Sequence, residues 1–283
     1  MDPKTKTVAV LGAGIMGNGI SQTIAAAGPY LVYMVDVAQA ILEQGLESIK
    51  KSLGRFTKKG EMTPEESEAI ISRITPTTDF EVVQESDLVV EAIPEDLALK
   101  IETFQKLNDL CPTHAIMGTN TSSLPITSIA AATERPDMVI GIHFMNPVPV
   151  MKGVEVIKGL MTSPETVQAT VNFVESIGKI PCLALDYAGF INSRLLSIYI
   201  NEAVLAVMDG NPPEEVDKGM IHTANMPMGP LKLLDLIGLD VHLKIMDILR
   251  NEYGDRFLAA PLTRQMFRAG HLGRKTGRGF YQY

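Results

Sequence analysis

The sequence predicts an α/β fold, in which a doubly wound sheet with an inserted helical hairpin is followed by an all-helical C-terminal domain. At 283 residues the chain is long enough for two domains, each with its own core. Short apolar runs alternate with helical patterns first, whereas only helical periodicity follows from residue 190, at 190–208, 213–224, 230–252 and 260–269. We therefore expect an α/β domain at 1–185 and a helical domain at 186–283.

Charge and composition exclude several classes of protein. The net charge of -8 argues against a general nucleic-acid or membrane surface, because both need an excess of lysine and arginine. Cys111 and Cys182 lie far apart and fit neither a metal site nor a disulfide framework. The first apolar run, Val8–Leu11, is too short for a signal or membrane-spanning segment. We expect a soluble cytoplasmic protein that binds no metal, nucleic acid or membrane.

A glycine-rich turn joins the first expected strand, residues 7–11, to the first helix. Its three glycines have the G-x-G-x-x-G spacing: the first permits a tight turn, the second lets backbone approach a pyrophosphate, and the third lets helix pack on strand. The phosphates would meet the N-terminus of the helix. The sequence therefore predicts a Rossmann-type dinucleotide site. The loop residues expected at the cofactor are Gly12, Gly14, Ile15, Met16 and Gly17.

The second expected strand, residues 31–35, ends in an acid that favours NAD as the cofactor. Asp36 lies 36 - 17 = 19 residues after the last glycine of the turn, where a carboxylate bonds the ribose 2′-hydroxyl. Val37 and Ala38 follow, so no adjacent arginine is available for a 2′-phosphate. NAD is therefore expected rather than NADP.

A helix with one basic face follows the second strand. Apolar residues between 42 and 56 are spaced by three or four, which is typical of an amphipathic helix. A solvated face explains its basic residues as well as a clamp for a phosphate-bearing substrate does. Thr63-Pro64-Glu65-Glu66 then indicates a second helix start, so the two helices would form the inserted hairpin. The basic residues are Lys50, Lys51, Arg55, Lys58 and Lys59.

Polar side chains follow two later strands. One strand, at 86–93, enters a loop that contains Glu95, and another, at 115–119, ends in the run Asn120-Thr121-Ser122-Ser123. Serine and threonine also favour helix starts, so a capped turn is the alternative interpretation of that run. Because strand ends face the cofactor in doubly wound sheets, we expect Asn120 among the cofactor contacts.

His143 and Glu155 form the candidate catalytic pair. One expected strand delivers His143 and another carries Glu155, so neighbouring antiparallel strands would let the two side chains meet. A neutral imidazole is a suitable general base for oxidising an alcohol, and a carboxylate on its other nitrogen fixes the tautomer. Ser122 and Asn146 can hydrogen-bond the reacting oxygen. Considered alone, His143 is more often a structural side chain.

Several segments together resemble the L-3-hydroxyacyl-CoA dehydrogenases, and in particular the single-function bacterial 3-hydroxybutyryl-CoA dehydrogenases. The resemblance covers essentially the whole chain, in order. It implies reversible, NAD-dependent oxidation of a short-chain (S)-3-hydroxyacyl-CoA to a 3-ketoacyl-CoA by a homodimer that pairs through its helical domain. The segments are residues 12–17, 120–124, 143–147, 154–156, 227–230 and 273–281.

The resemblance also implies roles for individual residues. The catalytic His-Glu pair of the family falls on His143 and Glu155, and its substrate-contacting serine on Ser122. Its cofactor-contacting residues fall on Glu95 and Lys100. Its CoA-contacting residues fall on Ser52 and Lys59, which would explain the basic helix, because CoA carries a pyrophosphate and a 3′-phosphate.

Two alternatives stay open on the sequence. A dehydrogenase of a free 3-hydroxy acid would share both domains but typically uses a catalytic lysine, so the His143–Glu155 pair and the basic helix favour a thioester substrate. A non-catalytic NAD-binding protein would retain cofactor affinity without turnover of any acyl-CoA. Ser193 is the only support for this second alternative.

Ser193 stands where the family commonly has an asparagine that approaches the substrate. The family reads Gly-Phe-x-x-Asn-Arg, whereas this chain has Gly189-Phe190-Ile191-Asn192-Ser193-Arg194. Asn192 points about 100° away on a helix, and serine can hydrogen-bond but is shorter. We expect an altered substrate fit or a lower rate, which the kinetics of a Ser193→Asn variant would test.

Overall fold

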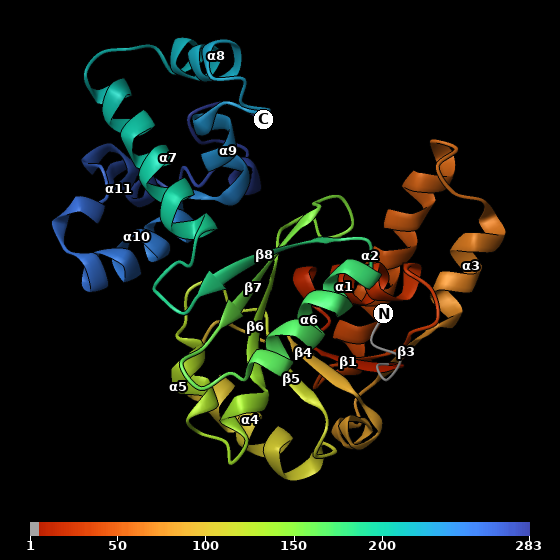
Figure 1. Ribbon diagram of the computed structural model, residues 1–283. Coiled ribbons are helices and arrows are strands. Elements are labelled where there is room, and N and C mark those ends of the chain that lie inside the picture. The colour runs from red at the N-terminus through yellow and green to blue at the C-terminus, as the bar shows by residue number, and fades with distance from the viewer. Residues whose placement is uncertain (1–5) are drawn as a thin grey trace. The chain divides into compact units, whose positions relative to one another are not determined.

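The computed structural model describes residues 6–283, and two compact units divide the chain between Asp186 and Tyr187. The first unit contains the sheet and the second contains only helices and irregular segments among its described elements (Figure 1). The doubly wound sheet and the helical second part that the sequence predicts are thereby confirmed.

An eight-stranded sheet in the order β3-β2-β1-β4-β5-β6-β7-β8 forms the centre of the first unit (Figure 1). The described neighbours pair in parallel, except that β6 pairs antiparallel with β7. Chain order reverses between β1 and β4, which makes their carboxyl ends the switch point of the sheet. The strands are β1 (Thr7–Leu11), β2 (Leu31–Val35), β3 (Ile74–Thr77), β4 (Leu88–Glu91), β5 (Ile116–Thr119), β6 (Val139–Phe144), β7 (Gly153–Lys158) and β8 (Ile180–Leu185).

The central strands are continuous apolar runs because helices cover both of their faces. Every residue of β4 and of β6 is buried, the usual pattern for strands inside a covered sheet. Strand β6 extends beyond its expected end, so His143 lies within the strand rather than after it. Strands β3 and β8 were not predicted: β3 contains Pro76, and β8 lies at the sheet edge with Leu183 and Leu185 exposed.

Helices α2 and α3 form the expected hairpin. Helix α3 begins at a capping box, in which Thr63 Oγ1 accepts from Glu66 N at 3.2 Å and Glu66 Oε2 accepts from Thr63 N at 2.8 Å. Helix α6, which was not predicted, is capped by Ser163 and has Pro164 as its first residue. The helices of this unit are α1 (Ile15–Ala26), α2 (Gln39–Lys58), α3 (Pro64–Ser72), η1 (Phe80–Glu85), α4 (Leu97–Leu110), α5 (Ile126–Ala130), η2 (Pro136–Met138) and α6 (Pro164–Ser176).

Helix α2 packs closely on the glycine-rich turn. A Cβ atom on Gly45 would lie 2.7 Å from the Ala13 carbonyl oxygen, so only glycine permits this approach. The opposite end of α2 carries the basic residues, with Lys58 as its last residue. The turn and the basic helix are therefore parts of one packed body.

The helix expected at 230–252 is two helices. Gly238 has φ +101° and ends α9 before α10 begins, because its backbone conformation is one that residues with a Cβ atom rarely adopt. Buried Asp235 accepts from Phe280 N and Tyr281 N, both at 2.9 Å, and so ties the end of the chain to α9. The helices of the second unit are α7 (Asn192–Met208), α8 (Pro213–Thr223), α9 (Pro230–Ile237), α10 (Leu239–Tyr253), η3 (Asp255–Phe257), α11 (Pro261–Arg268) and η4 (Arg274–Thr276).

None of the described helices has the length and apolar character required to cross a bilayer.

His242 should make the stability of the second unit depend on pH. Its side chain is 1% exposed, and burial lowers its pKa to about 4. Because an unfolded histidine has a pKa of about 6.5, the unfolded chain takes up the proton first as pH falls. This contribution to the free energy of unfolding is therefore complete above pH 6.5 and is lost as the pH falls from 6.5 to 4, with a loss of about 2 to 3 kcal/mol at pH 4.5.

Urea unfolding of the wild type and of His242→Leu at pH 7.5 and 4.5, followed by circular dichroism, measures this effect. The free energy of unfolding of the wild type should fall by about 2 to 3 kcal/mol more than that of the variant over this interval. Equal losses in the two proteins would contradict the assignment.

Candidate active site

The glycine-rich turn at the end of β1 is built by close approaches that exclude side chains. Gly12 has φ +96°, and a Cβ atom there would lie 2.5 Å from the Ala92 oxygen. A Cβ atom on Gly17 would lie 1.7 Å from the Gly12 oxygen. At Gly14, which precedes α1, a Cβ atom would meet no atom within 4 Å, and no side chain caps the helix. This uncapped end fits the pyrophosphate of a dinucleotide.

Asp36 is held beside this turn. Its Oδ2 accepts from Ala13 N and its Oδ1 from Val37 N, both at 2.8 Å. Each carboxylate oxygen retains a further lone pair with which a ribose hydroxyl can bond. Of the other predicted loop contacts, Ile15 is exposed and Met16 is partly buried against the core. The turn and Asp36 thus fit the NAD that the sequence predicts.

Three charged side chains, here called the Lys100 cluster, lie at the carboxyl end of β4. Lys100 Nζ is 2.5 Å from Glu91 Oε1 and 3.4 Å from Glu95 Oε2. Lys100 is 1% exposed and Glu91 is 0% exposed. The sequence reasoning missed Glu91, although an acid at the end of an apolar strand was the available signal.

Glu95 connects the loop after β4 to the polar run after β5. Its Oε1 accepts from Thr121 Oγ1 at 2.6 Å, from Ser122 N at 3.0 Å and from Ser122 Oγ at 3.3 Å. Burial alone would raise the pKa of Glu95, but the Lys100 ammonium and these hydrogen bonds lower it below its usual value. Ser122, which was predicted to contact substrate, is therefore held by an ionised carboxylate.

His143 and Glu155 meet across the antiparallel pair of strands, as the sequence predicts. They are direct partners in the β6–β7 register, and His143 Nδ1 lies 2.7 Å from Glu155 Oε2. Both side chains are buried. Because the carboxylate can only accept, Nδ1 donates the hydrogen bond, and Nε2 is the nitrogen without a proton in the neutral ring.

Asn120 and the loop after β6 complete this edge of the sheet. Asn120 N donates to the backbone carbonyl oxygen of Glu91 at 2.7 Å, and Asn120 Oδ1 accepts from Phe144 N at 2.8 Å. Asn146 is exposed in the loop. The sequence reasoning missed Lys179, whose Nζ donates to the carbonyl oxygens of Val148 and Met151, both at 2.7 Å. Burial lowers the pKa of Lys179.

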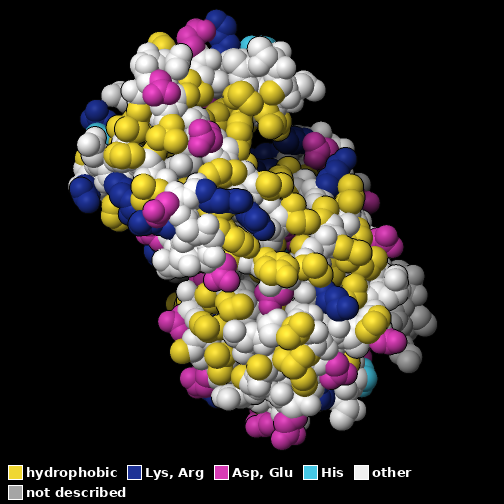
Figure 2. All heavy atoms as spheres, turned by 60° about the vertical axis from the view of Figure 1, so that its left-hand side comes forward, with side chains coloured by type: hydrophobic (Ala, Val, Ile, Leu, Met, Phe, Trp, Pro, Cys, Tyr) yellow, Lys and Arg dark blue, Asp and Glu magenta, His cyan; other side chains and the backbone are white. Residues whose placement is uncertain are grey.

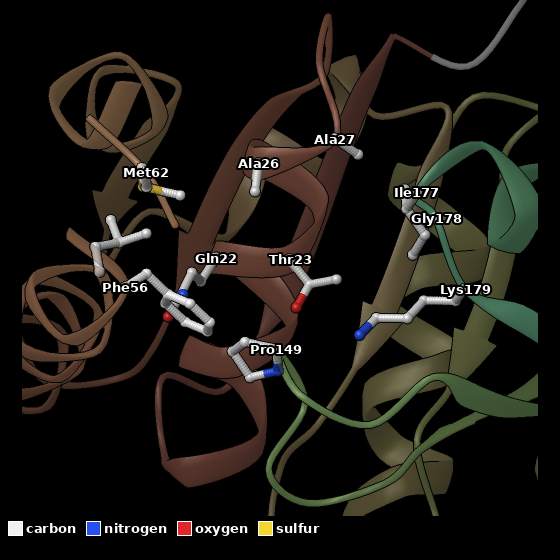
Figure 3. Close-up of a pocket in the computed structure, with 11 residues that line it drawn as sticks. Gln22, Thr23, Ala26, Ala27, Phe56, Met62, Pro149, Ile177, Gly178 and Lys179 are labelled. Atoms are coloured by element: carbon white, nitrogen blue, oxygen red, sulfur yellow. The ribbon is translucent and has the colours of Figure 1, made fainter. Parts of the chain in front are cut away.

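A pocket of about 290 Å³ lies between α1, α2 and the turn before β8 (Figure 3). Ser52 is half-buried on α2, and Lys59 is exposed immediately after the helix. Ser193, in contrast, is buried in the first turn of α7 in the second unit. The pocket is lined by Gln22, Thr23, Ala26, Ala27, Leu53, Phe56, Met62, Pro149, Ile177, Gly178 and Lys179.

Family models match both parts of the chain. Residues 7–187 match the model described as "3-hydroxyacyl-CoA dehydrogenase, NAD binding domain". Residues 189–283 match the model described as "3-hydroxyacyl-CoA dehydrogenase, C-terminal domain".

Individual relatives match over nearly their whole length. The "Probable 3-hydroxybutyryl-CoA dehydrogenase" of Bacillus subtilis is 49% identical over 280 residues, which cover 98% of this chain and 97% of the relative. The 3-hydroxybutyryl-CoA dehydrogenase of Clostridioides difficile is 45% identical over 278 residues, 98% of this chain and 99% of the relative. The crystal structure of (S)-3-hydroxybutyryl-CoA dehydrogenase from Ralstonia eutropha superposes with a TM-score of 0.94 at 41% identity, covering 99% of each chain.

Replacing Asp36 with alanine should weaken NADH binding about tenfold, because the ribose hydroxyls lose a charged acceptor. The ratio of the Kd for NADPH to the Kd for NADH should also fall, since a negative charge facing the 2′-phosphate is removed. Fluorescence titration with both nucleotides measures the two effects. The exposed acid Asp109 on α4 provides the control, and Asp109→Ala should change neither affinity. Wild-type NADH affinity in Asp36→Ala would refute this role of Asp36.

Proposed function

Because the chain belongs to the 3-hydroxyacyl-CoA dehydrogenase family, we propose that it oxidises a short-chain (S)-3-hydroxyacyl-CoA, 3-hydroxybutyryl-CoA, reversibly to the 3-ketoacyl-CoA with NAD. The observation that carries this proposal is the 2.7 Å contact between His143 Nδ1 and Glu155 Oε2, at the edge of the sheet that also holds the glycine-rich turn. A base with a fixed tautomer at the cofactor edge is what alcohol oxidation by hydride transfer requires.

The His143–Glu155 pair handles the proton of the reaction. Bound NAD would supply the acceptor for the hydride from C3 of the substrate, and Nε2 of His143 would take the hydroxyl proton. Glu155 stabilises the imidazolium that forms, because its carboxylate already accepts from Nδ1. Ser122 and Asn146 would bond the reacting oxygen and so polarise the carbonyl in the reverse direction.

The CoA part of the substrate is assigned to helix α2. Ser52 and Lys59 would contact the CoA phosphates, helped by the other basic side chains near the end of that helix. The pocket in Figure 3 adjoins this helix and has Phe56 and Met62 on its wall, so it offers an apolar surface for part of the chain that links the phosphates to the thioester. A free 3-hydroxy acid has neither phosphates nor this chain, which argues against the free-acid alternative.

We also propose that the protein is a cytoplasmic homodimer that pairs through its second unit. Large hydrophobic side chains are exposed there, and a helical unit with such faces is a candidate for self-association (Figure 2). The exposed hydrophobic side chains include Ile191, Leu195, Met208, Leu236, Val241, Leu258 and Phe267.

Sedimentation equilibrium should give about twice the 30.8 kDa mass of one chain. Leu195 is 61% exposed on α7. A Leu195→Arg variant should shift the protein toward monomer if this face of α7 forms the interface. A single-chain mass for the wild type would refute the dimer.

The purified protein should oxidise NADH rapidly with acetoacetyl-CoA but not with free acetoacetate, and NADPH should replace NADH poorly. His143→Ala should lower kcat by about a thousandfold, because the base is lost. Glu155→Gln should lower kcat less, by about ten- to a hundredfold, since the amide still bonds the ring but no longer stabilises the imidazolium. Absorbance at the NADH band follows each reaction.

The exposed side chain of His114, which lies 3.1 Å from Asp87, provides a matched control. His114→Ala should keep the wild-type kcat, and both catalytic variants should keep wild-type NADH binding. Turnover of acetoacetyl-CoA by His143→Ala at the wild-type rate would overturn the mechanism. Reduction of free acetoacetate instead would favour the free-acid alternative.

A further inference from the structure

Glu91 is a buried carboxylate that the mechanism above does not use. It is the last residue of β4, and its register partners are Leu11 at the end of β1 and Thr119 at the end of β5. It therefore lies at the switch point of the sheet, where dinucleotides bind in folds of this kind.

The strand order indicates which half of the cofactor lies nearest to Glu91. Asp36, for the adenosine ribose, follows β2, and the glycine-rich turn, for the pyrophosphate, follows β1. His143 lies in β6, on the other side. Since the hydride acceptor must be near the base, the nicotinamide half lies over the ends of β4 and β5. This placement rests on the proposed function.

Both oxygens of Glu91 are fixed by the surrounding structure. Its Oε1 accepts from Lys100 Nζ at 2.5 Å and from Ile93 N at 2.8 Å. Its Oε2 accepts from Thr119 Oγ1 at 2.7 Å. Glu91 thus joins the start of α4 to the end of β5, and it holds the ammonium group of Lys100 in one position.

The Lys100 cluster carries a net negative charge. One ammonium, on Lys100, lies between the two carboxylates of Glu91 and Glu95, which gives a sum of +1 - 2 = -1. The nicotinamide ring is cationic in NAD⁺ and uncharged in NADH. A negative cluster beside it attracts the oxidised form more strongly, and burial makes such an interaction stronger than it would be in water.

We propose that Glu91 is a positioning residue for the nicotinamide half of the cofactor, and that its charge makes the site discriminate in favour of NAD⁺ over NADH. It acts through Lys100 and Glu95, on which the cofactor contacts of the family fall, and not by touching the substrate. A buried ion pair that only stabilised the loop would affect the two redox forms equally. The ratio of the two affinities therefore separates these roles.

Glu91→Gln removes the charge with little change of shape. The amide oxygen can still accept from Lys100 and Ile93 N, and the amide nitrogen can donate to Thr119 Oγ1. We expect the Kd for NAD⁺ to rise about tenfold and the Kd for NADH to rise less than about threefold. Isothermal titration of each nucleotide, after circular dichroism has verified folding, gives both values. Glu102→Gln, at an exposed site on α4, should leave both unchanged.

Glu91→Asp keeps the charge but is too short to contact both Lys100 and Thr119. This variant should bind NAD⁺ and NADH more weakly by similar factors, so that the ratio of the two Kd values stays within about twofold of the wild-type ratio. If Glu91→Gln does not fold, Glu91→Asp can still refute the positioning role, because wild-type binding of both nucleotides by this variant would overturn it.

Two further outcomes would overturn the charge discrimination. In the first, Glu91→Gln loses affinity for NAD⁺ and NADH equally. In the second, Glu91→Asp changes the ratio of the two Kd values as much as Glu91→Gln does. A wild type that binds both nucleotides but turns over no 3-hydroxyacyl-CoA would refute the proposed function alone, and the ratio would still test Glu91. A wild type that binds neither nucleotide would refute both proposals.

Discussion

The antiparallel pairing of β6 with β7 is the constraint on which the candidate site depends. The register places His143 directly opposite Glu155, so the pair is set by backbone hydrogen bonds rather than by flexible loops. A slip of one residue would turn Glu155 to the other face of the sheet and separate the pair. The other described strand pairs are parallel and bring the loops after β1, β4 and β5 to the same edge. One sheet thus positions the base and the cofactor contacts together.

The loops at this edge are tied to one another by a few hydrogen bonds. Glu95 binds the run after β5, and Asn120 bonds to the backbone of Glu91 in β4 and of Phe144 in β6. Lys179 holds the loop that carries Asn146 through two carbonyl oxygens. Groups fixed in this way need little rearrangement when charge develops during the reaction, which is the main physical source of electrostatic catalysis.

The sequence predicted the parts of the fold that have strong local signals. The strand–glycine turn–helix unit, the acid after β2 and the His143–Glu155 pair all follow from residue type and spacing. Strand β8 was missed because its apolar side chains face outward, and the break at Gly238 because one glycine inside a helical pattern does not identify its φ angle. Lys179 was missed because its partners are backbone carbonyls, which no residue pattern reveals. Glu91 was missed because its apolar neighbours in the strand hid the one available signal, an acid at the strand end.

The close approach of Gly45 to Ala13 limits how this protein can change its substrate range. Helix α2 cannot move closer to the glycine-rich turn without disturbing the cofactor loop, because Gly45 already lies against Ala13 with no room for a Cβ atom. Descendants of this sequence that hold the CoA chain differently would therefore have to alter side chains around the pocket, such as Phe56 or Met62, rather than move the helix inward. Evolution of the substrate fit would then proceed by changes of side-chain volume on a backbone that cofactor binding keeps constant.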